Sequence, residues 1–375
     1  MTLPPGSSVC SRQSLPIRQR KLALAVLVAL GSGMLAGCSG TGTLSTYDPS
    51  RAHHRPGGFV NVYGPTGGKS LAQVLRWRWQ AWRQALPPAP TEGYESIKVV
   101  EPDFERLASP STTAPTITWI GHATVLLQVN GVNILTDPIF SDRASPVRWA
   151  GPKRKRPLPA SLAQLPRIDL VVISHNHADH LDEPTIRELV NQQGGQPQFL
   201  VPLGVDALLK EFGVTKTQPM DWWDRYEVGE LRMTFVPAQH WSARGLSDRN
   251  KTLWGGWVIE GAGKSVYFAG DTGYSRHFAE IGARFGGFDL ALIPIGAYEP
   301  RWFMKDQHVN PDEAARIHID VRSRLSVGVH WGSFELTDEA LDKPRTDLAT
   351  ARQKYGIGDE QFIVLDIGQT LEVNE

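Results

Sequence analysis

The chain has 375 residues, with 39 basic and 39 acidic side chains and a formal net charge of zero. This length suits one large domain with its own core, and the balanced charge does not favour nucleic acid as a partner. The two cysteines, Cys10 and Cys38, lie near the N-terminus, which excludes a cysteine zinc site or a disulfide framework in the rest of the chain.

The first 37 residues have the pattern of a targeting signal. Arg18, Arg20 and Lys21 precede an apolar run over residues 22–37. A run of this length is short for a membrane span and typical of the hydrophobic part of a signal peptide. The N-terminus therefore predicts an exported protein.

The segment "LAGC" at residues 35–38 resembles the lipobox of bacterial lipoproteins. The resemblance implies cleavage before Cys38 and attachment of lipid to that residue, with a plain secretory signal as the alternative. Ser39 stands where retention in the inner membrane would require Asp, so an outer-membrane anchor facing the periplasm is expected. Residues 38–70 are rich in Gly, Ser, Thr and Pro and predict a flexible tether, in which His53 and His54 could bind metal adventitiously.

The stretch "LAQVLRWRWQAWRQALPP" at residues 71–88 predicts a helix that the two prolines end. Leu75, Trp79 and Trp82 fall at helical spacing and arginines lie between them. Packing of these aromatic residues against the domain is the favoured interpretation, and a helix lying on a membrane surface is the alternative. The helix would be an N-terminal extension of a single hydrolase domain over residues 71–375.

Short apolar runs that are typical of strands alternate with helical segments beyond residue 116. The predicted strands lie at residues 116–140 (a hairpin), 168–174, 198–202, 231–240, 253–260, 265–272, 288–296, 325–332 and 361–373. Helices are expected at residues 184–190, 204–212 and 310–319. This order, without an internal repeat, predicts an α/β fold.

Metal-binding residue types follow several of these strands. His175, His240, Asp271 and His330 each stand at or just past the end of a predicted strand, where side chains converge on one edge of an α/β sheet. The motif "HNHADH" at residues 175–180 adds three more candidate ligands. Seven ligands would overfill one catalytic zinc site, which keeps an open position, so they divide between two metals.

This pattern resembles the HxHxDH signature of the metallo-β-lactamase superfamily. The resemblance implies an αββα sandwich with a binuclear site at one edge, carrying zinc or, with the same ligand types, iron or manganese. By position, the first metal would be bound by His175, His177 and His240, the second by Asp179, His180 and His330, with Asp271 as the bridge between them.

Three further stretches, "WIGHATVLLQVNGVNILTDPIFSDRASP", "GPKRKRPLP" and "HVNPDEA", are similar to the branch that contains N-acyl-phosphatidylethanolamine-hydrolysing phospholipase D and its bacterial lipoprotein relatives. The resemblance covers about residues 70–370. It implies a phosphodiesterase acting on a phospholipid-like substrate, with hydroxide held between the metals as nucleophile and Asp179 accepting its hydrogen bond. A lactonase or other ester hydrolase using the same site is an alternative, and a non-catalytic envelope lipoprotein is another.

Other polar residues have two interpretations each. His308 would donate to the leaving group or stabilise charge, or it is a helix-entry histidine bonded to the backbone. His122 and Asp137 are expected to orient ligands or organise loops. The basic run at residues 153–156 is expected to be a solvated loop, with attraction of phosphate headgroups as the alternative. The expected partners are a membrane, through the anchor, and a lipid-like or small-molecule substrate.

Overall fold

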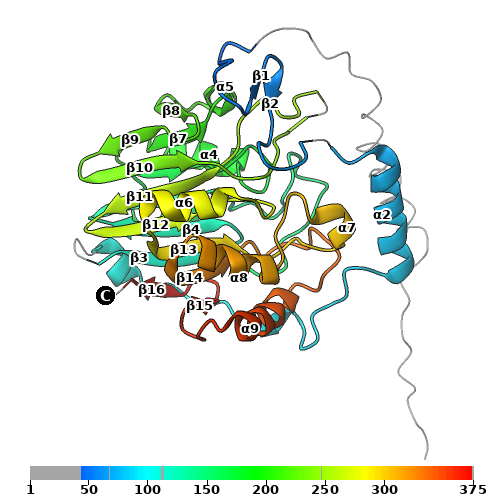
Figure 1. The fold of residues 1–375 in the computed structure, drawn as a ribbon. Coiled ribbons are helices and arrows are strands. Elements are labelled where there is room, and N and C mark those ends of the chain that lie inside the picture. The colour runs from blue at the N-terminus through cyan, green and yellow to red at the C-terminus, as the bar shows by residue number, and fades with distance from the viewer. Residues whose placement is uncertain (1–43, 67, 111–113, 246, 374–375) are drawn as a thin grey trace, which may run out of the picture.

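The computed structural model describes residues 44–66, 68–110, 114–245 and 247–373. Two seven-stranded sheets face each other, and helices cover their outer faces (Figure 1). The first sheet has the order β16 (Thr370–Glu372), β3 (Thr116–Gly121), β4 (Thr124–Val129), β5 (Val132–Thr136), β6 (Leu170–Val172), β7 (Gln198–Pro202) and β8 (Thr217–Met220). The predicted αββα sandwich in a single domain is confirmed.

The second sheet has the order β15 (Phe362–Ile363), β14 (Ser323–Val329), β13 (Phe288–Pro294), β12 (Lys264–Phe268), β11 (Gly256–Gly261), β10 (Leu231–Val236) and β9 (Arg225–Val228). The described helices are α2 (Leu71–Gln84), α3 (Phe104–Ala108), α4 (Glu183–Val190), α5 (Val205–Glu211), α6 (His277–Phe285), α7 (Arg301–Met304), α8 (Pro311–Asp320) and α9 (Lys343–Tyr355), with 3₁₀ turns at Tyr94–Ser96 and Leu162–Gln164.

Side chains of the central strands alternate between two apolar layers. On β4, Val125 and Leu127 enter the core between the sheets, whereas Leu126 joins the outer layer. Ile186 of α4 and Leu209 of α5 belong to that same outer layer. Burial on both faces explains why these strands read as continuous apolar runs.

Parallel pairing places several strand ends on one edge of the sandwich. In the first sheet β5, β6, β7 and β8 are parallel, and in the second β12, β13, β14 and β15 are parallel. The carboxyl ends of such strands lie together and leave backbone for functional loops. The predicted ligands follow strands of both sheets at this edge.

The first described segment packs on the domain. Phe59, on the short strand β2 (Gly58–Phe59), is 2% exposed and belongs to the main core. His53 and His54, which begins the paired strand β1 (His54–Arg55), are buried against Asp221. The prediction of a flexible tether is therefore wrong from residue 44 through this segment. The signal peptide at residues 1–37, Cys38 and the tether up to residue 43 lie outside the described residues.

Helix α2 forms where the sequence predicts it, and Ser70 caps its N-terminus. The expected packing of its aromatic stripe is wrong, because Leu75, Trp79 and Trp82 are 49%, 54% and 64% exposed. A different face, which includes the buried Ala81, turns towards the domain. Within the described residues, no helix is long and apolar enough to cross a membrane.

Candidate metal centre

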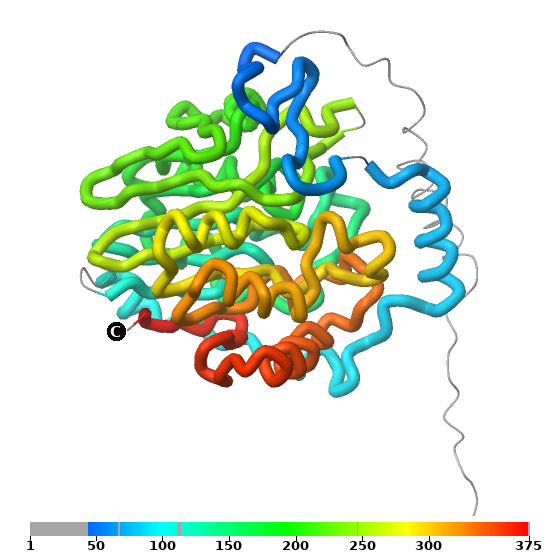
Figure 2. Tube along the Cα trace, viewed as in Figure 1, coloured from blue at the N-terminus to red at the C-terminus, as the bar shows by residue number. Residues whose placement is uncertain are grey.

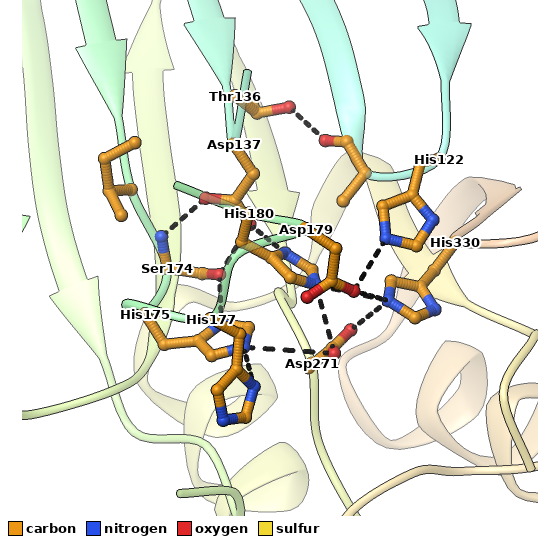
Figure 3. Close-up of polar contacts among 12 residues, drawn as sticks. His122, Thr136, Asp137, Ser174, His175, His177, Asp179, His180, Asp271 and His330 are labelled. Atoms are coloured by element: carbon orange, nitrogen blue, oxygen red, sulfur yellow. Dashed lines mark hydrogen bonds and ion pairs between the residues drawn. The ribbon is translucent and has the colours of Figure 1, made fainter. Parts of the chain in front are cut away.

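Loops that follow β6, β10, β12 and β14 bring all seven predicted ligands together at one edge of the sandwich (Figure 3 labels six of them). Except for His177 and Asp179, which are partly exposed, these side chains are buried. His330 is held in the left-handed backbone region at φ 61°. Non-glycine residues in that conformation are uncommon and collect at functional sites.

The first ligand group consists of His175, His177 and His240. The Nδ1 atom of His177 lies 2.7 Å from Nε2 of His175 and 3.3 Å from Nε2 of His240. A proton on Nδ1 of His177 can form a well-aligned hydrogen bond to only one of the two facing Nε2 lone pairs, so the other is left without a donor. A cation between the three rings would bind all three lone pairs, and neutral imidazole is a good ligand for zinc.

The second ligand group consists of Asp179, His180 and His330. The Nε2 atoms of His180 and His330 are 3.1 Å apart. The Oδ2 atom of Asp179 lies 3.4 Å from the first and 3.7 Å from the second. This group therefore offers two nitrogens and one carboxylate oxygen to a single cation.

Asp271 stands between the two groups. Its Oδ2 lies 3.1 Å from Nε2 of His180, 3.9 Å from that of His240 and 4.0 Å from that of His175, and its Oδ1 lies 3.1 Å from Nε2 of His330. One carboxylate thus reaches nitrogens of both groups, as a bridging ligand must. The geometry brings together the ligand set expected for two metals.

Hydrogen bonds on the far side of three rings fix which nitrogen carries the proton. Nδ1 of His180 donates to Asp137 at 2.7 Å, and Nδ1 of His240 donates to the carbonyl of Gln307 at 2.8 Å. Ser174 donates its hydroxyl to Asp137 at 2.5 Å and accepts from Nδ1 of His175 at 2.9 Å. Each Nε2 is therefore left with its lone pair pointing into the site, as ligation requires.

Several polar atoms of the site are buried and have no hydrogen-bond partner: Nε2 of His177, Oδ1 of Asp271, Nδ1 of His308 and Nδ1 of His330. Buried polar atoms in native proteins normally have a partner. Burial also holds the pKa of His177 and His240 at about 3, so both rings are neutral at pH 7. Unsatisfied atoms and neutral rings fit a metal centre.

The carboxylates of Asp179 and Asp271 favour positive charge in the candidate metal centre. Burial alone would lower the pKa of His180, but the charges of Asp271 and Asp179 outweigh it and raise that pKa well above its usual value. Burial alone would raise the pKa of Asp271, but His180 and His330 hold it well below its usual range. Two ionised carboxylates in a buried site are stabilised by positive charge, which protonated His180 supplies without a metal and a divalent metal would supply in place of that proton.

His308 lies at the mouth of the site, just before α8. Its Nδ1 is 3.8 Å from Oδ2 of Asp271, and its ring centroid is 5.1 Å from that of His240. Its side chain has no backbone partner within the described residues. Of the two interpretations from sequence, the structure therefore favours a histidine that acts at the site. Burial lowers its pKa to about 3, which makes the ring a neutral hydrogen-bond donor.

His122 and Asp137 support ligands, as their sequence context indicates. Nε2 of His122 lies 3.0 Å from Oδ2 of Asp179 and orients that carboxylate. Asp137 is fully buried and accepts from His180 and from both the amide and the hydroxyl of Ser174.

We expect Asp137→Asn to weaken metal binding by about 10- to 100-fold, because the amide no longer holds His180 in the ligating tautomer. Metal affinity is measured by competition with a chromogenic chelator. The buried Asp221→Asn serves as the matched control, with affinity unchanged. An unaltered affinity in the Asp137 variant would contradict this role for Asp137.

Sequence reasoning missed two contacts of the ligands. Ser174, directly before His175, connects that ring to Asp137. Trp241, directly after His240, packs on the ring of His177 with centroids 4.2 Å apart. The only available signal was adjacency to a ligand, since both contacts join parts of the chain that the fold brings together.

A second cluster, formed by His53, His54 and Asp221, has a different chemistry. The amide of Asp48 donates to Nδ1 of His54 at 3.0 Å, so the proton of this ring is on Nε2, which donates to Asp221 at 3.0 Å. His53 is bonded to the other oxygen of Asp221 at 2.6 Å. His54 therefore has no lone pair for a metal, and the cluster ties the N-terminal segment to the domain.

The basic run at residues 153–156 is not a freely solvated loop. Arg154 donates to the carbonyl of Ile139, Lys155 pairs with Glu335 at 2.6 Å and Arg156 pairs with Glu95 at 2.5 Å. The favoured expectation is therefore wrong for three of the four residues. The ion pairs offset the charges of Lys155 and Arg156, whereas Arg154 donates to a neutral carbonyl group.

Comparison with known proteins gives a consistent family. A family model described as "Beta-lactamase superfamily domain" matches residues 132–331. The chain is 44% identical over 273 residues to N-acyl-phosphatidylethanolamine-hydrolyzing phospholipase D 1 of Caenorhabditis elegans, covering 69% of this chain and 76% of that protein. It is also 35% identical over 260 residues to the mitochondrial N-acyl-phosphatidylethanolamine-hydrolyzing phospholipase D of Saccharomyces cerevisiae. That match covers 68% of this chain and 55% of that protein.

The fold is also found in solved structures. The metallo hydrolase Igni18 from the archaeon Ignicoccus hospitalis matches 69% of this chain and 98% of its own, with a TM-score of 0.51 and 23% identity. At this identity the likeness concerns the fold alone.

Proposed function

The chain belongs to the metallo-β-lactamase superfamily and is a metal-dependent hydrolase, and from this premise we propose that it is a two-metal phosphodiesterase that cleaves an N-acyl-phosphatidylethanolamine-like phospholipid. The observation that carries the proposal is the pair of ligand groups joined by one carboxylate, Asp271. Two-metal sites of this kind suit in-line displacement at phosphorus.

The seven candidate ligands form two metal-binding groups. One metal would be held by His175, His177 and His240, and the other by Asp179, His180 and His330. We propose zinc for both positions because the ligands are mostly histidine, and two such divalent cations would activate water and offset charge on phosphoryl oxygens when bound. The ligand set also suits iron and manganese.

The polar groups around the metals act on the substrate. Asp179, oriented by His122, is 17% exposed on its side chain and would accept a hydrogen bond from the attacking water. His308, as a neutral donor beside Asp271, would stabilise negative charge that develops on a phosphate or leaving-group oxygen.

Two features support a phospholipid as the substrate class. The relatives in Caenorhabditis elegans and Saccharomyces cerevisiae are named for hydrolysis of N-acyl-phosphatidylethanolamine. The lipobox-like "LAGC" at residues 35–38 would place the enzyme on a bilayer through Cys38. We propose that it is anchored in the outer membrane and faces the periplasm.

A substrate panel tests the reaction class. The purified, zinc-loaded chain is assayed on N-acyl-phosphatidylethanolamine, bis(p-nitrophenyl) phosphate, lactones and β-lactams. Release of phosphatidic acid from the first substrate is the expected result. Turnover of lactones alone would replace this proposal with a lactonase, and no turnover by the metal-loaded chain would contradict a hydrolase of any of these classes.

A further inference from the structure

Helix α2 touches the domain along one side only. Ala81 is buried, and Trp77 packs on Phe303 of α7 with ring centroids 4.7 Å apart. The indole of Trp77 donates to Asp338 at 2.9 Å. These contacts fix the rotation of the helix, which stands at the side of the molecule next to α7 (Figures 1 and 2).

The opposite side of α2 carries an apolar stripe. Leu75, Trp79 and Trp82 are 49%, 54% and 64% exposed and follow one another at intervals of four and three residues. Residues at this spacing share one helix face. Trp302 of α7, 40% exposed, lies beside the helix, where Arg76 covers its ring at 4.8 Å.

Basic side chains accompany this stripe. Arg76, Arg78 and Arg83 lie on α2, and the helix has no acidic residue. None of the three forms an ion pair with a described residue, and Arg83 lies over the ring of Trp79 at 4.8 Å. Arg78 acts electrostatically on Asp338, so the surface combines exposed indoles with the positive charges of Arg76 and Arg83, which no described ion pair offsets.

We propose that α2 lies on a bilayer surface that contains anionic lipid, with Leu75, Trp79 and Trp82 at the level of the headgroups. Tryptophan on one side and arginine beside it is the composition of interfacial helices, and each basic residue near an anionic leaflet adds attraction. A second copy of the chain is a poorer occupant, because a symmetric contact would bring the arginines of both helices together.

The helix is connected to the metal centre through a short segment. Lys69, just before α2, pairs with Asp306 at 3.0 Å, and the carbonyl of the next residue, Gln307, accepts from His240 at 2.8 Å. A bilayer bound at α2 would thus lie next to the segment Asp306–Gln307, which contacts the candidate ligand His240. That consequence rests on the proposed function, since it concerns delivery of a phospholipid.

Site-directed spin labelling of the full chain tests the docking directly. Nitroxides are placed at position 79 (Trp79→Cys) or 149 (Trp149→Cys), with Cys10→Ser in both, and the chains are reconstituted in vesicles of phosphatidylethanolamine and phosphatidylglycerol. Trp149 is the matched control because it is an exposed tryptophan, 71% accessible, in a loop outside α2. The label at position 79 is expected to become accessible to oxygen and protected from a water-soluble nickel chelate, unlike the label at 149.

Equal exposure of both labels to the nickel chelate would overturn the proposal. A second copy of the chain would be the occupant if the label at position 79 were equally protected in detergent and light scattering gave a dimeric mass. In that case the double variant Trp79→Ser with Trp82→Ser would be monomeric.

A vesicle-bound substrate and a soluble substrate distinguish the proposed docking to the bilayer from the proposed reaction. Trp79→Ser with Trp82→Ser is expected to lower turnover of vesicle-bound phospholipid by at least about tenfold, from the apolar area no longer buried, and to leave turnover of bis(p-nitrophenyl) phosphate unchanged. Trp149→Ser leaves both unchanged. If the wild-type chain cleaves neither substrate, the proposed function fails while the spin-label result still decides the docking.

Discussion

Replacement of Asp271 by asparagine is expected to lower hydrolytic turnover on the order of 10³-fold, because loss of a bridging ligand removes several kcal/mol of charge stabilisation. The carboxylate reaches nitrogens of both ligand groups and is 3% exposed. An amide of the same size keeps the shape but loses the charge that holds two cations. The variant should bind fewer than two metals per chain, measured by mass spectrometry of the purified protein.

Asp221→Asn is the matched control for this change. Asp221 is also buried and also accepts from two histidines, but His54 has no lone pair available there. Metal content and turnover should stay at the wild-type level. Equal loss in the two variants would show that any buried His–Asp contact is needed for folding, and would contradict the special role of Asp271.

Replacement of His308 by alanine is expected to lower turnover of a phospholipid by roughly 10²- to 10³-fold, as for loss of one preorganised hydrogen-bond donor. Its Nδ1 lies 3.8 Å from Asp271, and its side chain is only 12% exposed. Because the ring is assigned to the substrate and not to a metal, metal content should not change. Steady-state kinetics and metal analysis on the same preparation measure both.

The leaving group shows which charge His308 stabilises. If the ring donates to the leaving oxygen, the defect should shrink with bis(p-nitrophenyl) phosphate, whose p-nitrophenolate needs little stabilisation. If it donates to a phosphoryl oxygen, the two substrates should suffer alike. Loss of a metal ion from the His308 variant would contradict both roles and make His308 a ligand.

The convergence of the candidate ligands could be predicted because each of them follows a strand or lies in one short motif of the sequence. His240 follows β10 and His330 follows β14. Because β10 is antiparallel to β11 and β11 is antiparallel to β12, β10 runs in the same direction as the parallel strands β12 to β14, and its end lies at the same edge. The spacing within "HNHADH" supplies the other ligands from a single loop. Which nitrogen of His180 would face a metal could not be predicted, since the Asp137 that accepts from the other nitrogen is 43 residues away.

The packing of the predicted tether and the orientation of α2 could not be predicted, because both depend on contacts between residues far apart in the sequence. His53 is buried against Asp221, 168 residues later, which accepts a hydrogen bond from its ring, and against Trp222, on which the ring stacks. In α2, Trp77 and Ala81 are four residues apart, as are Leu75 and Trp79. Periodicity identifies two faces, and only the contact with Phe303 decides which of them packs.

A metal titration of the chelator-treated chain tests the central claim most directly. Zinc is added in steps while phosphatidic acid release from N-acyl-phosphatidylethanolamine is followed. We predict that activity rises with added zinc and reaches its plateau at two equivalents per chain, one for each ligand group joined by Asp271. Two bound equivalents without release of phosphatidic acid, or full activity without bound metal, would contradict the account.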